Sequence, residues 1–103
     1  MATIKGQLRE VLKDGDSLSD LVCFYRNQEG EEYGSKEKPI QRCSGDELPE
    51  REFDDGWGGV NGEPTICFSA RYVYIRYQYD GSEDFCVVPR NPENVTFIPW
   101  PGG

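Results

Sequence analysis

The segment from Arg71 to Val88, RYVYIRYQYDGSEDFCVV, constrains the fold more than any other part of this chain. Two runs rich in aromatic and β-branched residues flank Asp80-Gly81, a pair preferred in the two-residue turn of a β-hairpin. The pattern predicts an antiparallel hairpin in which Tyr77 lies opposite Asp84. One face is predicted to carry Val73, Ile75, Cys86 and Val88, and the reverse face Tyr72, Tyr74, Arg76, Phe85 and Val87. Because both faces are largely apolar, we expect the hairpin at the centre of a sheet or in an interface.

The N-terminal segment Thr3–Asp14 has apolar residues at helical spacing and is followed by Gly15, which suits a left-handed helix cap. These features predict a short amphipathic helix. A strand over TIKGQL is the alternative, because Thr and Ile favour strands.

Other short runs of β-forming residues indicate further strands. The run Leu21–Asn27 predicts a strand that enters a hairpin, and TICFSA and VTFIPW, which begin at Thr65 and Val95, predict two more. Segment 35–55 has few apolar residues and predicts an extended surface connection. The chain is therefore expected to form one domain over residues 1–103. Its predicted class is α+β and β-rich, with a small antiparallel sheet, a central hairpin and one short N-terminal helix.

The charge of the chain narrows the class of its partners. A net charge of -8 and a pI near 4.4 produce a field that repels phosphate backbones and attracts basic protein surfaces. Direct binding to nucleic acid is therefore not expected. The chain contains no apolar run near the roughly 20 residues of a membrane helix, and its N-terminal residues lack the apolar core of a secretion signal. We expect a cytoplasmic protein without a membrane contact.

Residue types that common catalytic and metal sites require are missing from the sequence. The chain has no histidine, which removes the usual general base near neutral pH and the Ser-His-Asp and Cys-His pairs. Its four cysteines, Cys23, Cys43, Cys67 and Cys86, form no CxxC pair, so they are expected to be buried free thiols rather than zinc ligands. We expect no enzyme activity, no cofactor and no metal.

The glycine-rich stretch FDDGWGGVNGEP, residues 53–64, matches neither phosphate-binding loop pattern nor the spacing of a calcium loop. Two interpretations remain open. Its glycines form backbone turns around an anchoring Trp57, or the loop presents Trp57 to a partner.

Acidic residues alternate along DELPEREFDD, residues 46–55. If this stretch is extended, Glu50, Glu52 and Asp54 lie on one face about 6.6 Å apart. A ribbon with acids on both sides would have a linear charge density comparable to that of a nucleic-acid strand, and Asp55 is the fourth acid expected to contribute. The stretch therefore either mimics a phosphate backbone or keeps the protein soluble. Arg90, held between two prolines in VPRNPEN, either clamps an anionic group of a partner or pairs with an acid of this chain.

The runs GGVNGEP and YVYIRYQYDGSEDFCVVPRNP resemble a pattern in small phage and prophage proteins and cover about a third of the chain. With its small size and acidity, the chain is similar to phage-encoded antagonists of bacterial defence, of the anti-CRISPR kind. The resemblance implies an inhibitor in the host cytoplasm that occupies a basic host protein, such as a nucleic-acid-binding defence effector.

The residues expected to contact a partner come from the acidic stretch, the glycine-rich loop and the hairpin. They are Glu50, Glu52, Asp54, Asp55, Trp57, Tyr72, Tyr74, Arg76 and Arg90. A homodimer is compatible with the apolar hairpin. Two other functions remain open: a sponge that sequesters a signalling nucleotide between aromatic rings and Arg71, Arg76 or Arg90, and a structural or assembly protein of a virion.

Overall fold

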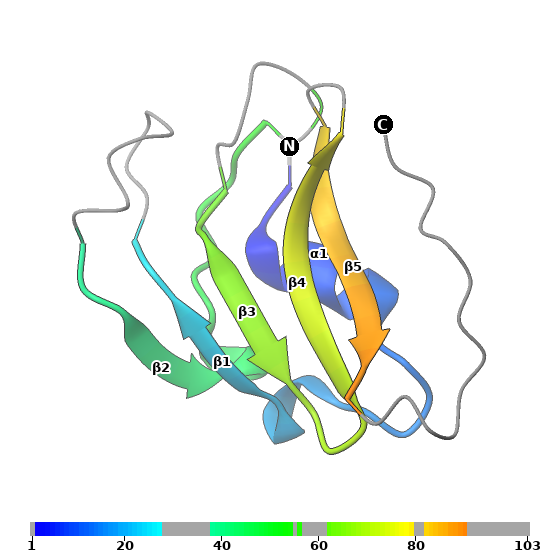
Figure 1. Ribbon diagram of the computed structural model, residues 1–103. Coiled ribbons are helices and arrows are strands. Elements are labelled where there is room, and N and C mark those ends of the chain that lie inside the picture. Colours follow the sequence, from blue (N-terminus) through cyan, green and yellow to red (C-terminus); the bar gives the residue numbers. More distant parts are fainter. Residues whose placement is uncertain (1, 28–37, 55, 57–61, 80–81, 91–103) are drawn as a thin grey trace.

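The computed structural model describes residues 2–27, 38–54, 56, 62–79 and 82–90. These residues form one antiparallel sheet with the strand order β2-β1-β3-β4-β5, and one α-helix packs behind it (Figure 1). The strands are β1 (Val22–Tyr25), β2 (Gln41–Ser44), β3 (Thr65–Phe68), β4 (Tyr72–Tyr79) and β5 (Ser82–Pro89), and the helices are α1 (Ile4–Val11) and the 3-10 turns η1 (Leu18–Asp20) and η3 (Gly45–Glu47). The predicted α+β, β-rich class is correct.

Helix α1 begins at a capping residue that the sequence contains. The Thr3 side chain accepts a hydrogen bond from the Gly6 backbone N–H at 3.0 Å, which satisfies one of the free donors of the first turn. The helix ends at Val11, before the predicted Asp14, because the chain becomes extended at Leu12. Gly15 does adopt a left-handed conformation, with φ of 89°, but in a separate turn after the helix.

Strands β4 and β5 pair in the register expected for a two-residue turn, with Tyr77 opposite Asp84. The turn residues 80 and 81 lie outside the described residues. The predicted central position of this hairpin is not confirmed, since β5 is the last strand in the described order and β4 is its strand neighbour there. The sheet continues from β4 to β3, which is the strand predicted from TICFSA. The VTFIPW segment lies outside the described residues.

Strand β2 lies in the segment 35–55, for which the sequence predicts an extended surface connection and no strand. Its sequence QRCS has no apolar alternation of its own, and pairing with β1 makes it a strand. Cys43 of β2 lies opposite Cys23 of β1, and Cys23 lies opposite Cys67 of β3. Long-range pairing therefore overrides the weak local propensity of this segment.

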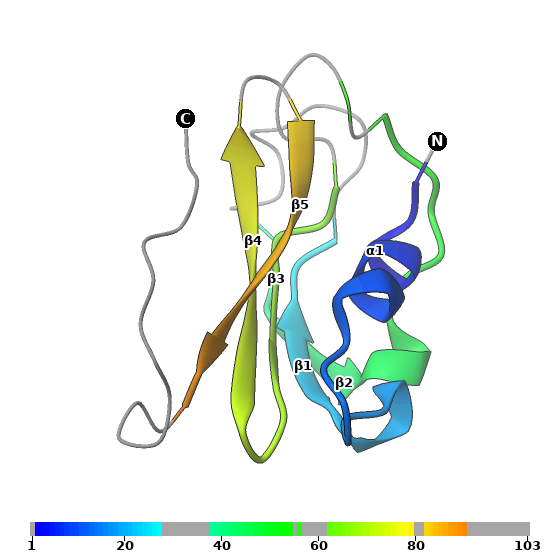
Figure 2. The same cartoon turned by 90° about the vertical axis from the view of Figure 1, so that its right-hand side faces the viewer.

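The core lies between the sheet and α1. It consists of Ile4, Leu8, Leu18, Leu21, Cys23, Leu48, Phe53, Cys67, Tyr74, Phe85 and Val87. Figure 2 shows α1 on one side of the sheet, so the sheet has a covered face and, among the described residues, an open face. Alternation along the strands sends Tyr74, Phe85 and Val87 to the covered face. No helix in the described part of the chain is both long and apolar enough to cross a membrane.

Candidate functional site

The predicted acidic face exists in residues 50–54, and we name Glu50, Glu52 and Asp54 the acidic edge. These three side chains are exposed, whereas Arg51 between the first two is half-buried and Phe53 is buried. The alternation of exposure is the one that the spacing i, i+2 predicts for an extended segment. Asp55, the fourth acid of the prediction, lies outside the described residues.

The residues between the acids attach this segment to the domain. Phe53 exchanges two backbone hydrogen bonds with Ala2, of 2.9 and 2.8 Å. Arg51 Nε donates to Glu63 Oε2 at 2.7 Å, and its guanidinium lies 6.0 Å from the Phe53 ring centroid. Glu50 accepts a hydrogen bond from Lys5 of α1 at 3.2 Å. These contacts hold the segment that carries the acidic edge against the rest of the domain.

A buried ion pair lies beneath Phe53. Arg76 Nη2 donates to Glu83 Oε1 at 2.6 Å, and the two side chains are only 11% and 1% exposed. The Arg76 guanidinium also donates to Gln7 and lies 4.8 Å from the Phe85 ring centroid and 5.7 Å from that of Phe53. This ion pair joins α1, β4 and β5 to the segment that carries the acids.

Gly62 packs against this ion pair, and its contacts show why the glycine-rich stretch has a glycine at this position. Its backbone N–H donates to Glu83 Oε1 at 2.9 Å. A Cβ at this position would lie 2.8 Å from that oxygen, 2.8 Å from Phe53 Cζ and 3.0 Å from Arg76 Nη2. At least this glycine is required by close packing. Residues 57–61, including Trp57, lie outside the described part of the chain.

Charge is divided unequally between the two layers. Segments 2–21 and 45–54, which form the helical layer and the acidic edge, contain nine acidic and four basic residues. The five strands contain two of each kind. Most of the described negative charge therefore lies away from the open face of the sheet.

Two hairpin residues predicted to contact a partner lie inside the protein instead. Tyr74 is 0% exposed, and its hydroxyl donates to Asp16 at 2.5 Å and accepts from the Lys13 backbone N–H at 3.1 Å. Burial and the Asp16 hydrogen bond raise the pKa of Tyr74 to about 12. Arg76 belongs to the buried ion pair. Both expectations are corrected because alternation places these residues on the face that α1 covers.

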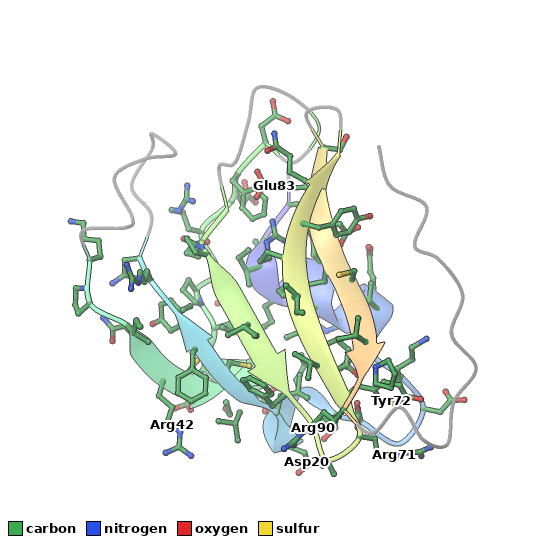
Figure 3. All side chains as sticks on the ribbon, in the orientation of Figure 1. Asp20, Arg42, Arg71, Tyr72, Glu83 and Arg90 are labelled. Atoms are coloured by element: carbon green, nitrogen blue, oxygen red, sulfur yellow. The ribbon has the colours of Figure 1, made fainter. Side chains whose placement is uncertain are left out.

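Tyr72 and Arg90 keep partial access to solvent. Tyr72 is half-buried, with the cations of Lys13 and Arg71 5.9 and 5.8 Å from its ring centroid. Arg90 is exposed, and its Nη1 donates to the Ser69 carbonyl at 2.7 Å. Its guanidinium lies 5.9 Å from the Phe68 ring centroid. Figure 3 shows Arg90 and Glu83 at opposite ends of the β4–β5 pair.

Several surface residues of interest were missed in the sequence. Ser44 and Glu47 form a capping box at η3, in which the Ser44 backbone N–H donates to the Glu47 carboxylate at 2.9 Å. This contact lowers the pKa of Glu47. The spacing S-x-x-E is a recognisable signal for it. Phe24 and Phe68, which meet edge to face at 6.2 Å on the open face, carry no such local signal.

The four cysteine side chains differ in how far they are buried. All four cysteines are free, with Cys23 and Cys67 buried and Cys43 and Cys86 half-buried. Burial raises the pKa of Cys43 to about 11, and a hydrogen bond to Cys23 together with burial raises the pKa of Cys67. Within the described ranges, no group of three or more His, Cys, Asp or Glu side chains is arranged to hold a metal ion.

Comparisons with known proteins do not assign the chain to a class. No protein-family model, curated protein or solved structure matches it.

Proposed function

We propose that this chain is a small, non-enzymatic inhibitor that binds a basic surface of another protein through the acidic edge. The observation that carries the proposal is the alternation in residues 50–54, which exposes Glu50, Glu52 and Asp54 while Arg51 and Phe53 attach the segment to the domain. By its resemblance to phage antagonists of defence, the partner is a nucleic-acid-binding defence effector in the host cytoplasm.

A fixed row of acids suits this role better than acids on a free loop. Carboxylates at alternate positions of an extended segment repeat about every 6.6 Å, so they match every second phosphate of a nucleic-acid strand, which carries one charge per about 3.4 Å of rise. Because the backbone of this row is already ordered by Phe53 and Arg51, binding costs less conformational entropy. The surrounding helical layer adds negative charge, which increases the rate of encounter with a basic partner.

The competing nucleotide sponge has less support from the described residues. Arg76, one of its candidate cations, is committed to Glu83 in the interior. Arg90 lies against Phe68 and the Ser69 carbonyl, on a protein whose net charge repels phosphates. Calorimetry with cyclic nucleotides separates the two functions. No contact of the described residues bears on a role in virion assembly.

The test begins in cells. The chain is expressed in bacterial strains that each carry one defence system, and the plating efficiency of a sensitive phage is measured. We expect the wild-type chain to restore plating in at least one strain. The triple variant Glu50→Gln, Glu52→Gln and Asp54→Asn should lose this effect. Each exposed charge contributes at most about 1 kcal/mol, so loss of all three should weaken binding by up to about 100-fold.

A matched control separates the acidic edge from the overall field. The variant Glu10→Gln, Asp14→Asn and Asp20→Asn removes the same number of charges from exposed positions elsewhere in the helical layer. This control variant should retain inhibition. Binding of the wild-type chain to its purified target should weaken steeply with added salt. Failure to restore plating in any strain would contradict the inhibitor proposal. Full activity of the acidic-edge variant would contradict the site.

A further inference from the structure

A cavity of about 240 Å³ lies where β1 ends and β3 begins. The Arg26 backbone N–H donates to the Pro64 carbonyl at 3.1 Å, which joins two sides of the cavity. The volume equals that of about eight water molecules at about 30 Å³ each, enough for one aromatic ring with a short substituent. The lining residues are Phe24, Tyr25, Arg26, Ile40, Pro64, Thr65 and Ile66.

Most of this lining is apolar. Phe24 contributes a ring, and Ile40, which is 62% exposed, forms the side nearest to β2. The hydroxyl of Thr65 already donates to the Glu63 carbonyl at 2.8 Å. Arg26 is the charged residue of the lining. The cavity therefore offers apolar walls with a cation, a combination typical of sites for small ligands.

Basic residues flank this cavity on an otherwise acidic chain. The Arg42 guanidinium lies 6.0 Å from the Phe24 ring centroid, and Figure 3 shows Arg42 beside β2. Outside segments 22–27 and 38–44, the described residues include twelve acidic and seven basic ones. Within these two flanking segments there are three basic residues and no acidic one: Arg26, Lys38 and Arg42. The local charge therefore favours an anion.

The described acids near the cavity are already held by other groups. Burial and the nearby carboxylates of Glu63 and Glu47 raise the pKa of Tyr25, so both acids lie close to this end of β1. Glu63 is buried and accepts a hydrogen bond from Arg51 at 2.7 Å. Glu47 accepts from the Ser44 backbone N–H at 2.9 Å. Both carboxylates are thus stabilised without the cations beside the cavity.

We infer that this cavity binds a small aromatic carboxylate, with its ring against Phe24 and its carboxylate toward Arg26 and Arg42. A carboxylate suits a guanidinium because the two groups form parallel hydrogen bonds. Its single charge is repelled by the net charge of -8 less than the charges of a phosphate would be. Asp84, on the open face, is three strands from β1, or about 14 Å, and screening limits its reach to about 8 Å.

The size of the surrounding surface favours a small molecule over a protein. Strands β1, β2 and β3 have four residues each, so their common face measures about 14 by 13 Å. This area is well below the roughly 800 Å² that each partner contributes to a standard protein interface. A ligand of about ten heavy atoms that fills the cavity needs no larger area, and its dissociation constant should be about 1 mM or lower.

Titration of isotope-labelled protein with sodium phenylacetate, followed by amide chemical shifts at constant ionic strength, measures this binding. We expect saturable shifts at Phe24, Arg26, Ile40 and Ile66, with a dissociation constant of about 1 mM or lower. Phenylacetamide has nearly the same shape without the charge. It should bind at least about tenfold more weakly, because it cannot form charge-assisted hydrogen bonds as an anion.

Variants of the two arginines test the assignment of the anion. Arg26→Gln combined with Arg42→Gln should weaken phenylacetate binding at least about tenfold and leave phenylacetamide binding unchanged. Arg42→Gln alone, at an exposed position, should weaken it about two- to fivefold. Arg9→Gln combined with Arg71→Gln is the matched control, which removes two exposed arginines elsewhere and should have no effect. The dispersion of the amide shifts shows whether each variant is folded.

Absence of saturable shifts up to about 20 mM phenylacetate, or shifts confined to other residues, would overturn the inference. Equal affinity for phenylacetamide, or full affinity in both arginine variants, would also overturn it, because the cavity would then not select an anion. Neutralising Glu29, Glu31 and Glu32 together should leave the affinity unchanged. If it instead rises at least about tenfold, carboxylates of this chain rather than a free ligand take the site. None of these variants changes the acidic edge, so this site and the proposed inhibition fail or succeed separately.

Discussion

The substitution Arg76→Met tests whether the buried ion pair holds the layers together. The side chain is replaced by an unbranched apolar one of similar length, so the main change is the loss of the guanidinium. Glu83 Oε1 would keep its contact with the Gly62 N–H but would lose its cationic partner. The Glu83 side chain, which is 1% exposed, would then lose the guanidinium that offsets its burial.

The size of the effect follows from this burial. Removing one partner of a buried ion pair costs about 3 to 5 kcal/mol, because the remaining charge is not solvated. The stacking of Arg76 on Phe85 and Phe53 would also be lost, which adds about 0.5 to 1 kcal/mol for each ring. A domain of this size has a free energy of unfolding of about 5 to 15 kcal/mol, so this loss removes a large part of it.

Urea unfolding followed by circular dichroism measures the loss, provided that the slope of the transition is unchanged. The double variant Arg76→Met and Glu83→Gln is the decisive comparison. It also removes the carboxylate charge that Arg76 offsets and should recover at least about 2 kcal/mol relative to Arg76→Met alone. A single variant within about 1 kcal/mol of wild type, or a double variant no better than the single one, would refute this account of the ion pair.

Three other changes test particular contacts. Gly62→Ala should destabilise the protein by about 1 to 3 kcal/mol because its Cβ meets three atoms at 3.0 Å or less, whereas Gly56→Ala, with nothing nearer than 3.9 Å, should have little effect in the same urea assay. The pKa of Tyr74 is raised to about 12 from an ordinary value near 10. Its contribution to the free energy of unfolding is therefore complete below pH 10 and is lost as the pH rises toward 12. The Tyr74→Phe variant should show about 2 kcal/mol less of this loss of stability between pH 10 and pH 12. Iodoacetamide should modify Cys43 slowly at pH 8 and rapidly after unfolding, because burial raises the pKa of this thiol to about 11. Rapid modification of Cys43 in the folded protein would contradict this last prediction.

The features that the sequence predicts well are those set by neighbouring residues. Asp80-Gly81 and the runs around it predict the β4–β5 register, and the spacing of Glu50, Glu52 and Asp54 predicts their common exposure. In both cases a period of two determines which side chains share a face.

The features that the sequence does not predict depend on contacts between distant segments. Strand β2 forms only because β1 provides a partner. In the described strand order the β4–β5 hairpin lies at one end, because β3 pairs with β4 and not with β5. Alternation groups Tyr74 with Arg76, but only the position of α1 decides that this group is buried. For that reason Tyr74, an expected partner-binding residue, is a core residue, and Arg76 belongs to the buried ion pair.

The division of charge explains why a basic partner is expected at the acidic edge rather than on the open face. Segments 2–21 and 45–54 contain nine acidic and four basic residues, and these segments form the helical layer and the acidic edge. On the open face, Arg42 lies beside Phe24 and Arg90 beside Phe68, so this face has cations next to its apolar side chains. The field of the described residues therefore directs a basic surface toward Glu50, Glu52 and Asp54.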